Sequence, residues 1–312
     1  MLLLREHKFM PSIIIRLIDG VLFGRKELRI NKFIAECGVC SRRAAEELIF
    51  EGKVLVNNKP ATIGMDIDPE NDRVTCEGKR IRIKAADKRY FMFYKPRGVI
   101  TSMKAQDDRS VISELIKGIK GRVYPVGRLD RDSEGLLILT DDGELAQKLS
   151  HPSHHIPKTY RVTISGKVTN EHLDKIRRGI SLDDDTVTLP ADVQIHAQGD
   201  DRTVLHITLY EGKNRQIRRM CEELNLNIML LKRIAVGEVN IGHMQPGQYR
   251  PLSHSEATKL CTAVGMKPPV FKKFDNKKGE MIQKNRNKTL ANKTSNERRF
   301  EKQLKDLNKS KK

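Results

Sequence analysis

The stretch that most constrains the fold of this chain is residues 127–140, where a run of charged side chains leads directly into the apolar segment 136–139. Consecutive apolar residues after a turn predict a buried strand, and the charges before them predict a polar loop at one end of it. A carboxylate beside a buried strand loses hydration, and it stays ionised only where a cation or a hydrogen-bond donor faces it. Asp130 is therefore the first candidate for a functional residue.

Two simpler interpretations of this loop are open at this point. Asp130, Asp132 and Glu134 lie at alternate positions, as in the opening of a calcium-binding loop. Ile138 at the ninth position and the short Asp141 at the twelfth depart from that pattern, which disfavours calcium. A surface turn of solvated charges is the other alternative, and the loop alone does not exclude it.

Three further motifs accompany this loop in order along the chain: Lys-Pro-Arg-Gly at residues 95–98, Lys-Thr-Tyr at residues 158–160 and Glu-Gly-Lys-Asn-Arg-Gln-Ile-Arg-Arg-Met at residues 211–220. Together with Gly-Arg-Leu-Asp at residues 127–130, they resemble the RsuA/RluB-type pseudouridine synthases, and the resemblance covers residues 28–255. It implies isomerisation of uridine to pseudouridine in ribosomal RNA, large-subunit (23S) rather than small-subunit (16S), without cofactor or metal. A non-catalytic RNA-binding factor for ribosome assembly is the alternative.

The resemblance also implies roles for residues within the motifs. Asp130 is the implied catalytic carboxylate, which would attack the sugar, attack the uracil or act as a base at C2′ of the ribose. Tyr160 is implied to pack against the flipped uracil. Arg128, Leu129 and Lys95 are implied to support the active site, and Arg128 and Lys95 are expected to support the opened state of the RNA around an extruded nucleotide.

The last motif begins a predicted helix, residues 214–224, whose two faces differ. Arg218 lies about 100° from Ile217 at the margin of the apolar face, so its guanidinium can reach inward as the counter-ion of Asp130. Arg219 lies on the opposite face, where no carboxylate partner is expected, and is predicted to contact RNA. The other members of the apolar face are Met220, Cys221 and Leu224, and the other predicted RNA contacts of this motif are Lys213 and Arg215.

Periodicity and composition divide the rest of the chain into segments. Residues 27–76 show two helical patterns, the second beginning after Ser41, and then a strand with an Asn-Asn turn; they resemble the small S4-type RNA-binding domain. Residues 77–88 are charged and lack periodicity, which predicts a linker. Residues 89–260 form the predicted catalytic domain. Its fold class is α+β, with a largely antiparallel mixed sheet flanked by helices.

The charge balance indicates the partner. The formal net charge is +19, from 59 Lys and Arg against 40 Asp and Glu in 312 residues, and such an excess favours a polyanion such as ribosomal RNA. Residues 261–312 are rich in Lys and Arg and poor in aliphatic residues, which predicts a disordered, RNA-binding tail. The cations of the S4-type segment that are predicted to follow a phosphate backbone are Arg42, Arg43, Lys53 and Lys59.

Cysteine usage and the N-terminus bear on the compartment. Five cysteines, an odd number scattered along the chain, favour a reducing, cytoplasmic environment over a disulfide framework. Residues 1–26 are expected to be an extension outside the domains, and their apolar run is too short and too interrupted to span a membrane. A monomer without membrane association is expected.

Two clusters invite a metal hypothesis. Cys37 and Cys40 have the C-x-x-C spacing, but no second pair completes a zinc site, so the two thiols are expected to pack between two helices. His151, His154 and His155 have no further ligand type nearby and are expected to belong to a loop. No metal site is predicted.

Overall fold

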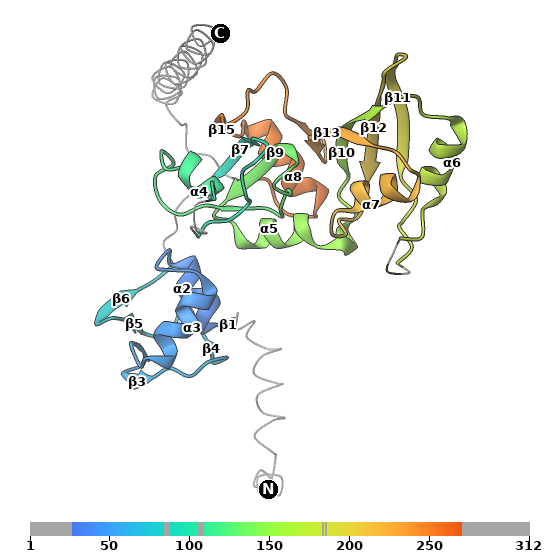
Figure 1. Cartoon of the computed structure of the whole chain (residues 1–312). Helices are drawn as coiled ribbons and strands as arrows, with labels where there is room; N and C mark the ends of the chain where they lie inside the picture. The colour runs from blue at the N-terminus through green and yellow to red at the C-terminus, as the bar shows by residue number, and fades with distance from the viewer. Residues whose placement is uncertain (1–26, 84–87, 105–108, 183, 185, 270–312) are drawn as a thin grey trace, which may run out of the picture. The chain divides into compact units, whose positions relative to one another are not determined.

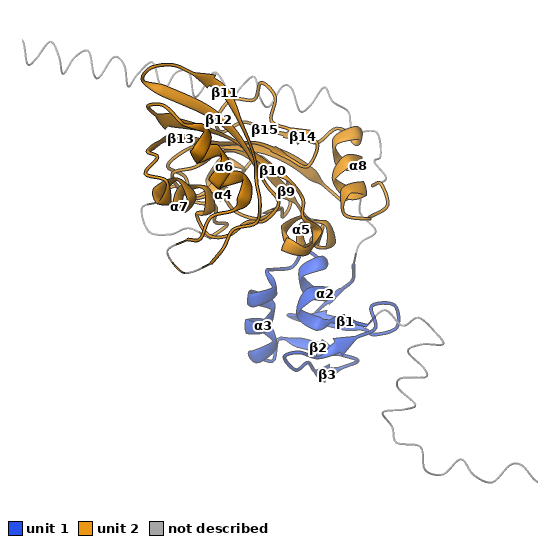
Figure 2. Ribbon diagram, turned by 90° about the vertical axis from the view of Figure 1, so that its right-hand side faces the viewer, with its two compact units in different colours: residues 1–86 blue, residues 87–312 orange. Residues whose placement is uncertain are grey.

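A computed structural model of the chain describes residues 27–83, 88–104, 109–182, 184 and 186–269 (Figure 1). The chain divides into two compact units, residues 1–86 and residues 87–312 (Figure 2). The predicted extension, residues 1–26, and most of the predicted tail, residues 270–312, lie outside the described residues.

Unit 1 consists of two helices packed on small antiparallel sheets. The apolar side chains of the predicted helical patterns, including Ile30, Phe33 and Ile34, form its core together with the inward residues of the strands. The Oγ of Ser41 accepts a hydrogen bond from the backbone N–H of Ala44 at 3.1 Å, which confirms the predicted N-cap. The elements are β1 (Leu28–Arg29), α2 (Ile30–Glu36), α3 (Arg42–Phe50), β2 (Val54–Val56), β3 (Lys59–Pro60), β4 (Asp66–Ile67), β5 (Val74–Cys76) and β6 (Lys79–Ile81).

The strand order of unit 1 is β3-β2-β5-β6, with β1 paired to β4. The turn between β2 and β3 is made by Asn57 and Asn58 with φ of 51° and 64°, as the Asn-Asn sequence predicts. The predicted linker is wrong over residues 77–81, because Glu77 and Gly78 form a positive-φ turn and β6 then pairs with β5. A three-residue strand lies below the length at which alternation can be recognised.

Unit 2 is built on a nine-stranded mixed sheet with the path β11-β12-β10-β13-β9-β7-β15; β14 pairs with β13 and β8 with β9. All pairs are antiparallel except β9 with β13, so the predicted α+β class is confirmed. The strands are β7 (Tyr90–Lys95), β8 (Tyr124–Pro125), β9 (Glu134–Thr140), β10 (Lys158–Ser165), β11 (Asp192–Gln198), β12 (Arg202–Leu209), β13 (Ile228–Val236), β14 (Val239–Asn240) and β15 (Tyr249–Pro251). The helices are α4 (Ile112–Leu115), α5 (Gly143–Ser150), α6 (Asn170–Arg178), α7 (Gln216–Glu223), α8 (His254–Ala263) and the 3-10 turn η1 (Pro152–His154).

Helices cover the sheet and bury β9, as the apolar segment predicts. Every residue of β9 from Gly135 to Thr140 is buried. Side chains of α5 and α8 form one core cluster with β7 and β9, and side chains of α6 and α7 form a second cluster with β10 and β12. The predicted end of the domain at residue 260 is too early, because α8 continues to Ala263, and Cys261 and Val264 are buried.

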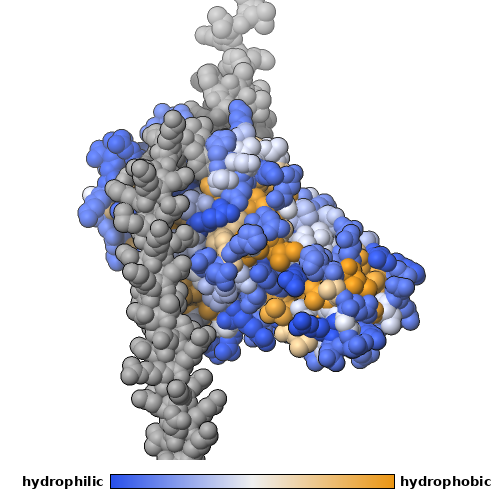
Figure 3. Space-filling model, turned by 90° about the horizontal axis from the view of Figure 1, so that it is seen from above, coloured by the Kyte–Doolittle hydropathy of each residue, from blue (hydrophilic) through white to orange (hydrophobic). Residues whose placement is uncertain are grey.

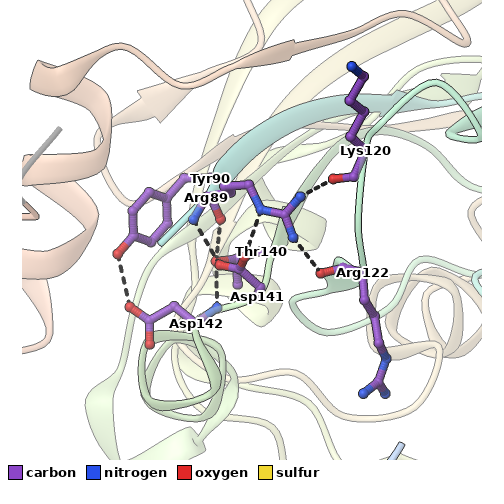
Figure 4. Close-up of polar contacts among 7 residues, drawn as sticks. All are labelled: Arg89, Tyr90, Lys120, Arg122, Thr140, Asp141 and Asp142. Atoms are coloured by element: carbon purple, nitrogen blue, oxygen red, sulfur yellow. Dashed lines mark hydrogen bonds and ion pairs between the residues drawn. The ribbon is translucent and has the colours of Figure 1, made fainter. Parts of the chain in front are cut away.

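A polar network fixes the start of β7 to the far end of β9 (Figure 4). Arg89 forms an ion pair with Asp141 at 2.7 Å and donates to the backbone oxygen of Arg122 at 2.9 Å. The Tyr90 hydroxyl donates to Asp142 at 2.9 Å, and the other carboxylate oxygen of Asp142 caps α5. Every carboxylate of this network therefore has partners, which is the arrangement expected of groups that stabilise the fold.

Figure 3 shows one face of the molecule, on which hydrophilic residues surround smaller hydrophobic areas. No helix in the described part of the chain is long and apolar enough to cross a bilayer.

Candidate active site

The loop between β8 and β9 holds Asp130 by its backbone and leaves its side chain available. Leu129 is buried, and its N–H and C=O are both bonded to the Thr101 hydroxyl, at 3.2 and 2.7 Å. On the other side, the Ser133 N–H donates to the backbone oxygen of Asp130 at 3.1 Å. Among the described residues, none forms a hydrogen bond or ion pair with the Asp130 carboxylate. The loop therefore presents a positioned carboxylate without a structural partner.

Lys95, the last residue of β7, lies beneath this loop. It has no exposed surface, and its Nζ donates to the backbone oxygens of Ser133 at 2.7 Å and Pro96 at 2.8 Å. Burial lowers the pKa of Lys95 to about 8, and the negative charge of Asp130 partly opposes that shift. No part of the Lys95 side chain reaches the surface, so it supports the loop from inside, and its predicted support of the opened RNA stays a prediction.

Asp130 and Tyr160 line one cavity of about 180 Å³. Tyr160 is half-buried in β10 and shares the inward face with Val162 and Ile164, as predicted from their alternation. Cavities that hold drug-sized molecules range from about 300 to 1,000 Å³, so this one suits a smaller planar group such as a single nucleobase. Asp130 and Tyr160 thus lie together, as expected of an active site.

Two of the cations that line the same cavity lie beside Tyr160. Lys158 precedes Tyr160 by two residues on the same face of β10, and Arg233 on β13 is the Cα partner of Tyr160. Arg233 is 5% exposed and donates from Nε to the backbone oxygen of Leu136 at 2.7 Å. Burial lowers the pKa of Lys158, and the positive charge of Arg233 adds to that shift.

A glycine permits the close approach that brings β13 to the loop. Gly135 has φ of 109°, and a Cβ at this position would lie 2.2 Å from the backbone oxygen of Arg233. Only glycine allows this parallel contact between β9 and β13, because a side chain would separate the strands. Gly135 therefore places Arg233 beside the catalytic loop.

Arg218 points inward from α7, as the helix faces predict, but its partner differs. Its terminal NH2 nitrogen donates to the backbone oxygen of Asp132 at 3.0 Å and lies 3.5 Å from the Ser133 hydroxyl. The predicted Arg218–Asp130 ion pair is absent from the described contacts of either residue. The buried Nε of Arg218 has no hydrogen-bond partner. Arg218 thus braces the loop that carries Asp130 and does not contact the carboxylate itself.

The segment before α7 forms another wall of the cavity. Glu211 is 8% exposed; it accepts from Gln216 Nε2 at 2.8 Å and forms an ion pair with Lys213 at 3.4 Å. Arg215 is the N-cap of α7 in a left-handed conformation, with φ of 48°. Lys213 and Arg215 line the cavity and therefore lie beside the site. Their predicted contact with RNA stays a prediction.

Arg219 has a carboxylate partner, which the sequence did not predict. It forms an ion pair with Asp184 at 2.6 Å, and the hydrogen bond from Arg219 lowers the pKa of the Asp184 carboxyl group to about 2. Arg219 is therefore not a cation without a carboxylate partner. The contact between Asp184 and α7 was not expected, since the sequence gives no information on a contact between residues so far apart along the chain.

Known proteins share this sequence and arrangement. The family model described as RNA pseudouridylate synthase matches residues 89–223, and the S4 domain model matches residues 28–74. A protein of Aquifex aeolicus described as an uncharacterized RNA pseudouridine synthase is 42% identical over 77% of this chain and 96% of its own length. The ribosomal large subunit pseudouridine synthase B of Bacillus subtilis is 40% identical over 74% of this chain and 95% of its own length.

A solved structure agrees with these sequence matches. The crystal structure of a pseudouridylate synthase superposes with a TM-score of 0.53 and 32% identity, over 75% of this chain and 99% of that chain. The chain belongs to the RNA pseudouridine synthase family. The resemblance to the RsuA/RluB type and the predicted order of an S4 domain before the synthase domain are thereby confirmed.

The predicted RNA-binding cations of the S4 domain differ in their surroundings. Arg42, Arg43 and Lys59 are exposed, so they are open to a phosphate backbone. Lys53 forms an ion pair with Glu51 at 2.7 Å, both side chains being about half exposed. A pair this exposed contributes little to stability, so it does not prevent Lys53 from exchanging Glu51 for a phosphate.

The metal hypotheses gain no support from the described residues, in which no group of three or more His, Cys, Asp and Glu side chains could hold an ion. Cys37 and Cys40 pack against the core of the S4 domain, as expected. His151 and His154 belong to the loop that contains η1, and the ring of His151 bonds to Ser153.

Sequence analysis did not identify Lys158, Arg233 or Thr101 as site residues of the synthase. Lys158 could have been found, because it lies two residues before Tyr160 in an alternating strand and must share its face. Thr101 and Arg233 carried no such signal. They reach the site through contacts with Leu129 and Leu136, far from them along the chain.

Proposed function

We propose that this synthase isomerises uridine to pseudouridine at one position of large-subunit ribosomal RNA, with Asp130 as the catalytic carboxylate. The observation that carries the proposal is the Asp130 carboxylate, which is fixed by its backbone, lacks a structural partner and lines a cavity of nucleobase size with Tyr160. The choice of the large subunit rests on the relative of that name in Bacillus subtilis.

One carboxylate is sufficient for this reaction. A glycosidase needs two carboxyl groups because it must also activate water. In pseudouridine formation the detached uracil stays in the cavity and is itself the second reactant, so no water is activated and no redox step occurs. Asp130 attacks the sugar, attacks the uracil or removes a proton from C2′; each of these roles requires an ionised carboxylate without a strong partner, as the loop provides.

The neighbouring residues have distinct roles in this proposal. Tyr160 packs against the extruded uracil, since its ring lies on the inward face that lines the cavity. Arg218 is a positioning residue, because it donates to the backbone of Asp132 and fixes the loop. Arg128 is exposed beside Asp130 and contacts the RNA from which the nucleotide has been extruded.

The S4 domain and the remaining cations bind the RNA around the target. Phosphate contacts from Arg42, Arg43, Lys53 and Lys59 position the RNA without reading its sequence. The synthase works as a monomer in the cytoplasm, and no cofactor takes part. A non-catalytic assembly factor is a weaker alternative, because a protein that only binds RNA gains nothing from a carboxylate left without a partner in a cavity.

Carbodiimide mapping of pseudouridine in total ribosomal RNA tests the proposal. We expect cells without this gene to lack one site in the large-subunit RNA, wild-type protein to restore it and the Asp130→Asn protein to leave it unmodified. A full set of sites without the gene, or restoration by Asp130→Asn, would contradict the proposal.

A further inference from the structure

The cavity contains more positive charge than the proposed chemistry of Asp130 uses. Arg233 is buried, and apart from the bond from its Nε to Leu136, the described residues offer its guanidinium no hydrogen bond or ion pair. Lys158 is half-buried, and the described contacts give its ammonium group no partner either. Both side chains line the cavity with Asp130 and Tyr160.

Two neighbouring cations in such a place favour an anion between them. Burial and the charge of Arg233 both disfavour the charged form of Lys158, so the two neighbouring cations are electrostatically unfavourable together. Neither cation lies within ion-pair distance of Asp130, so the negative charge of Asp130 does not neutralise their positive charges. An anion that enters during the reaction would be stabilised strongly, because burial reduces the screening of its charge by water.

The position of the pair indicates which part of the substrate supplies the negative charge. Arg233 is the Cα partner of Tyr160 across β10 and β13, and Lys158 lies two residues from Tyr160 on the same face. A uracil packed against Tyr160 therefore lies beside both cations. The phosphates of the RNA backbone are bulky and hydrated, and a side chain that is only 5% exposed lies too deep for them.

We infer that Lys158 and Arg233 stabilise the negative charge that develops on the uracil when it detaches from the ribose. This inference rests on the proposed function and adds the residues that bind the detached base. When the N1–C1′ bond breaks, its electron pair remains on the uracil and spreads to O2 and O4. The C5–C1′ bond then forms, the proton on C5 leaves and a proton joins N1, so atoms and electrons balance without a co-reactant.

The same two cations serve the uracil before and after it turns. C5 takes the place of N1 when the ring rotates by half a turn about the line through N3 and C6. That rotation also exchanges O2 with O4, so an oxygen of equal charge faces the cations in both orientations. Lys158 and Arg233 therefore hold the ring without favouring its first orientation, which is what an isomerisation requires.

Lys158→Met tests the inference, because methionine is similar in length to the half-buried lysine side chain and carries no charge. We expect the single-turnover rate at saturating ribosomal RNA to fall about 100-fold, the scale of one lost donor to a developing anion, with the RNA Kd unchanged within about twofold. Lys158→Arg should retain most of the rate. The matched control is Lys232→Met. Lys232 is next to Arg233 in sequence, but its ammonium group lies over the Tyr94 ring on the other side. The single-turnover rate of this variant should equal that of the wild type.

A better leaving group identifies the electrostatic role. Fluorine at C5 of uracil withdraws electrons and stabilises the detached anion. The reaction of RNA containing 5-fluorouridine therefore depends less on stabilisation of that anion by the two cations. We expect the Lys158→Met defect to shrink at least threefold on this RNA, with consumption of the fluorinated nucleoside measured by mass spectrometry of nuclease digests. Arg233→Gln, if it folds, should show the same pattern.

Several outcomes would overturn the inference. A weaker Kd with a normal rate at saturation would make Lys158 a phosphate contact, and an equal defect on uridine and 5-fluorouridine would make its role structural. A normal Lys158→Met enzyme would exclude any role. These results all require an active wild-type enzyme, whereas a wild-type protein inactive on every ribosomal RNA would instead contradict the proposed function.

Discussion

The two ends of β9 carry carboxylates in opposite situations. After the strand, Asp141 and Asp142 are bonded to Arg89, to the Tyr90 hydroxyl and to the first N–H groups of α5 (Figure 4). Before the strand, Asp130 is held only through its backbone, and the described residues provide its side chain with no partner. The same residue type therefore serves stability at one end and, in the proposed function, chemistry at the other.

This difference shows how a fold separates the two tasks. A carboxylate whose oxygens are occupied stabilises the structure and cannot react, because a substrate would have to displace its partners. The stabilising contacts of this loop are made by the residues around Asp130, among them Leu129, Ser133 and Lys95, so the Asp130 side chain stays available to react. The comparison predicts that substitutions at the two ends of β9 affect different measurements.

Asp130→Asn should have the largest effect of all on turnover. It keeps the shape and removes the charge, so we expect pseudouridine formation to be undetectable, at least about 10⁴-fold lower, while RNA affinity stays within about tenfold and unfolding free energy within about 0.5 kcal/mol. Tritium release from uracil-labelled RNA and urea unfolding measure the two quantities. Substantial turnover would contradict the role of Asp130, and a large loss of stability would contradict the comparison.

Arg218→Ala should lower turnover about 100-fold, equivalent to about 3 kcal/mol, because it removes the donor that fixes Asp132 beside the catalytic carboxylate. Its neighbour provides the matched control. Arg219→Ala breaks an ion pair whose carboxylate is mostly exposed, so single-turnover rates should change less than about threefold. Equal rate losses in the two variants would show that Arg218 has no special role in positioning the loop.

Asp142→Ala should affect stability and leave the chemistry unchanged. It removes the N-cap of α5 and leaves the buried Tyr90 hydroxyl without its acceptor, so we expect a loss of about 2 kcal/mol in urea unfolding. Turnover per folded molecule should equal that of the wild type. Asp142→Asn keeps a capping oxygen and should lose less than half as much; a loss of turnover in folded Asp142→Ala would break the comparison between the two ends.

The effect that is smallest at neutral pH concerns Lys95, because it appears only at alkaline pH. Its pKa is lowered to about 8, below the ordinary value of 10.5, so between these values the unfolded chain binds the extra proton and stability rises with pH. We expect wild-type unfolding free energy to rise relative to Lys95→Met by up to about 1.4 kcal/mol per pH unit from pH 8 to 10.5. Parallel curves for the two proteins would show that Lys95 has an ordinary pKa.

Local signals in the sequence predicted much of the fold and part of the site. The buried strand β9, the inward face of β10 that carries Tyr160, the apolar face of α7 and the N-cap at Ser41 all followed from spacing over a few residues. The short strand β6 did not, because three residues are too few for a periodic pattern. The position of Asp130 at the edge of a buried strand made it a candidate, and the resemblance to the RsuA/RluB type assigned its role.

Tertiary structure alone decided what each of these residues contacts. The sequence brought Asp130 and Arg218 into one hypothesis, but the fold places the guanidinium on the backbone of Asp132. It also brings Arg233 into the cavity through the register of β13 against β9 and β10. Periodicity fixes the face on which a side chain lies, because neighbouring residues determine the local backbone. The partner on that face depends on strand register and helix packing between segments roughly a hundred residues apart, which no local pattern encodes.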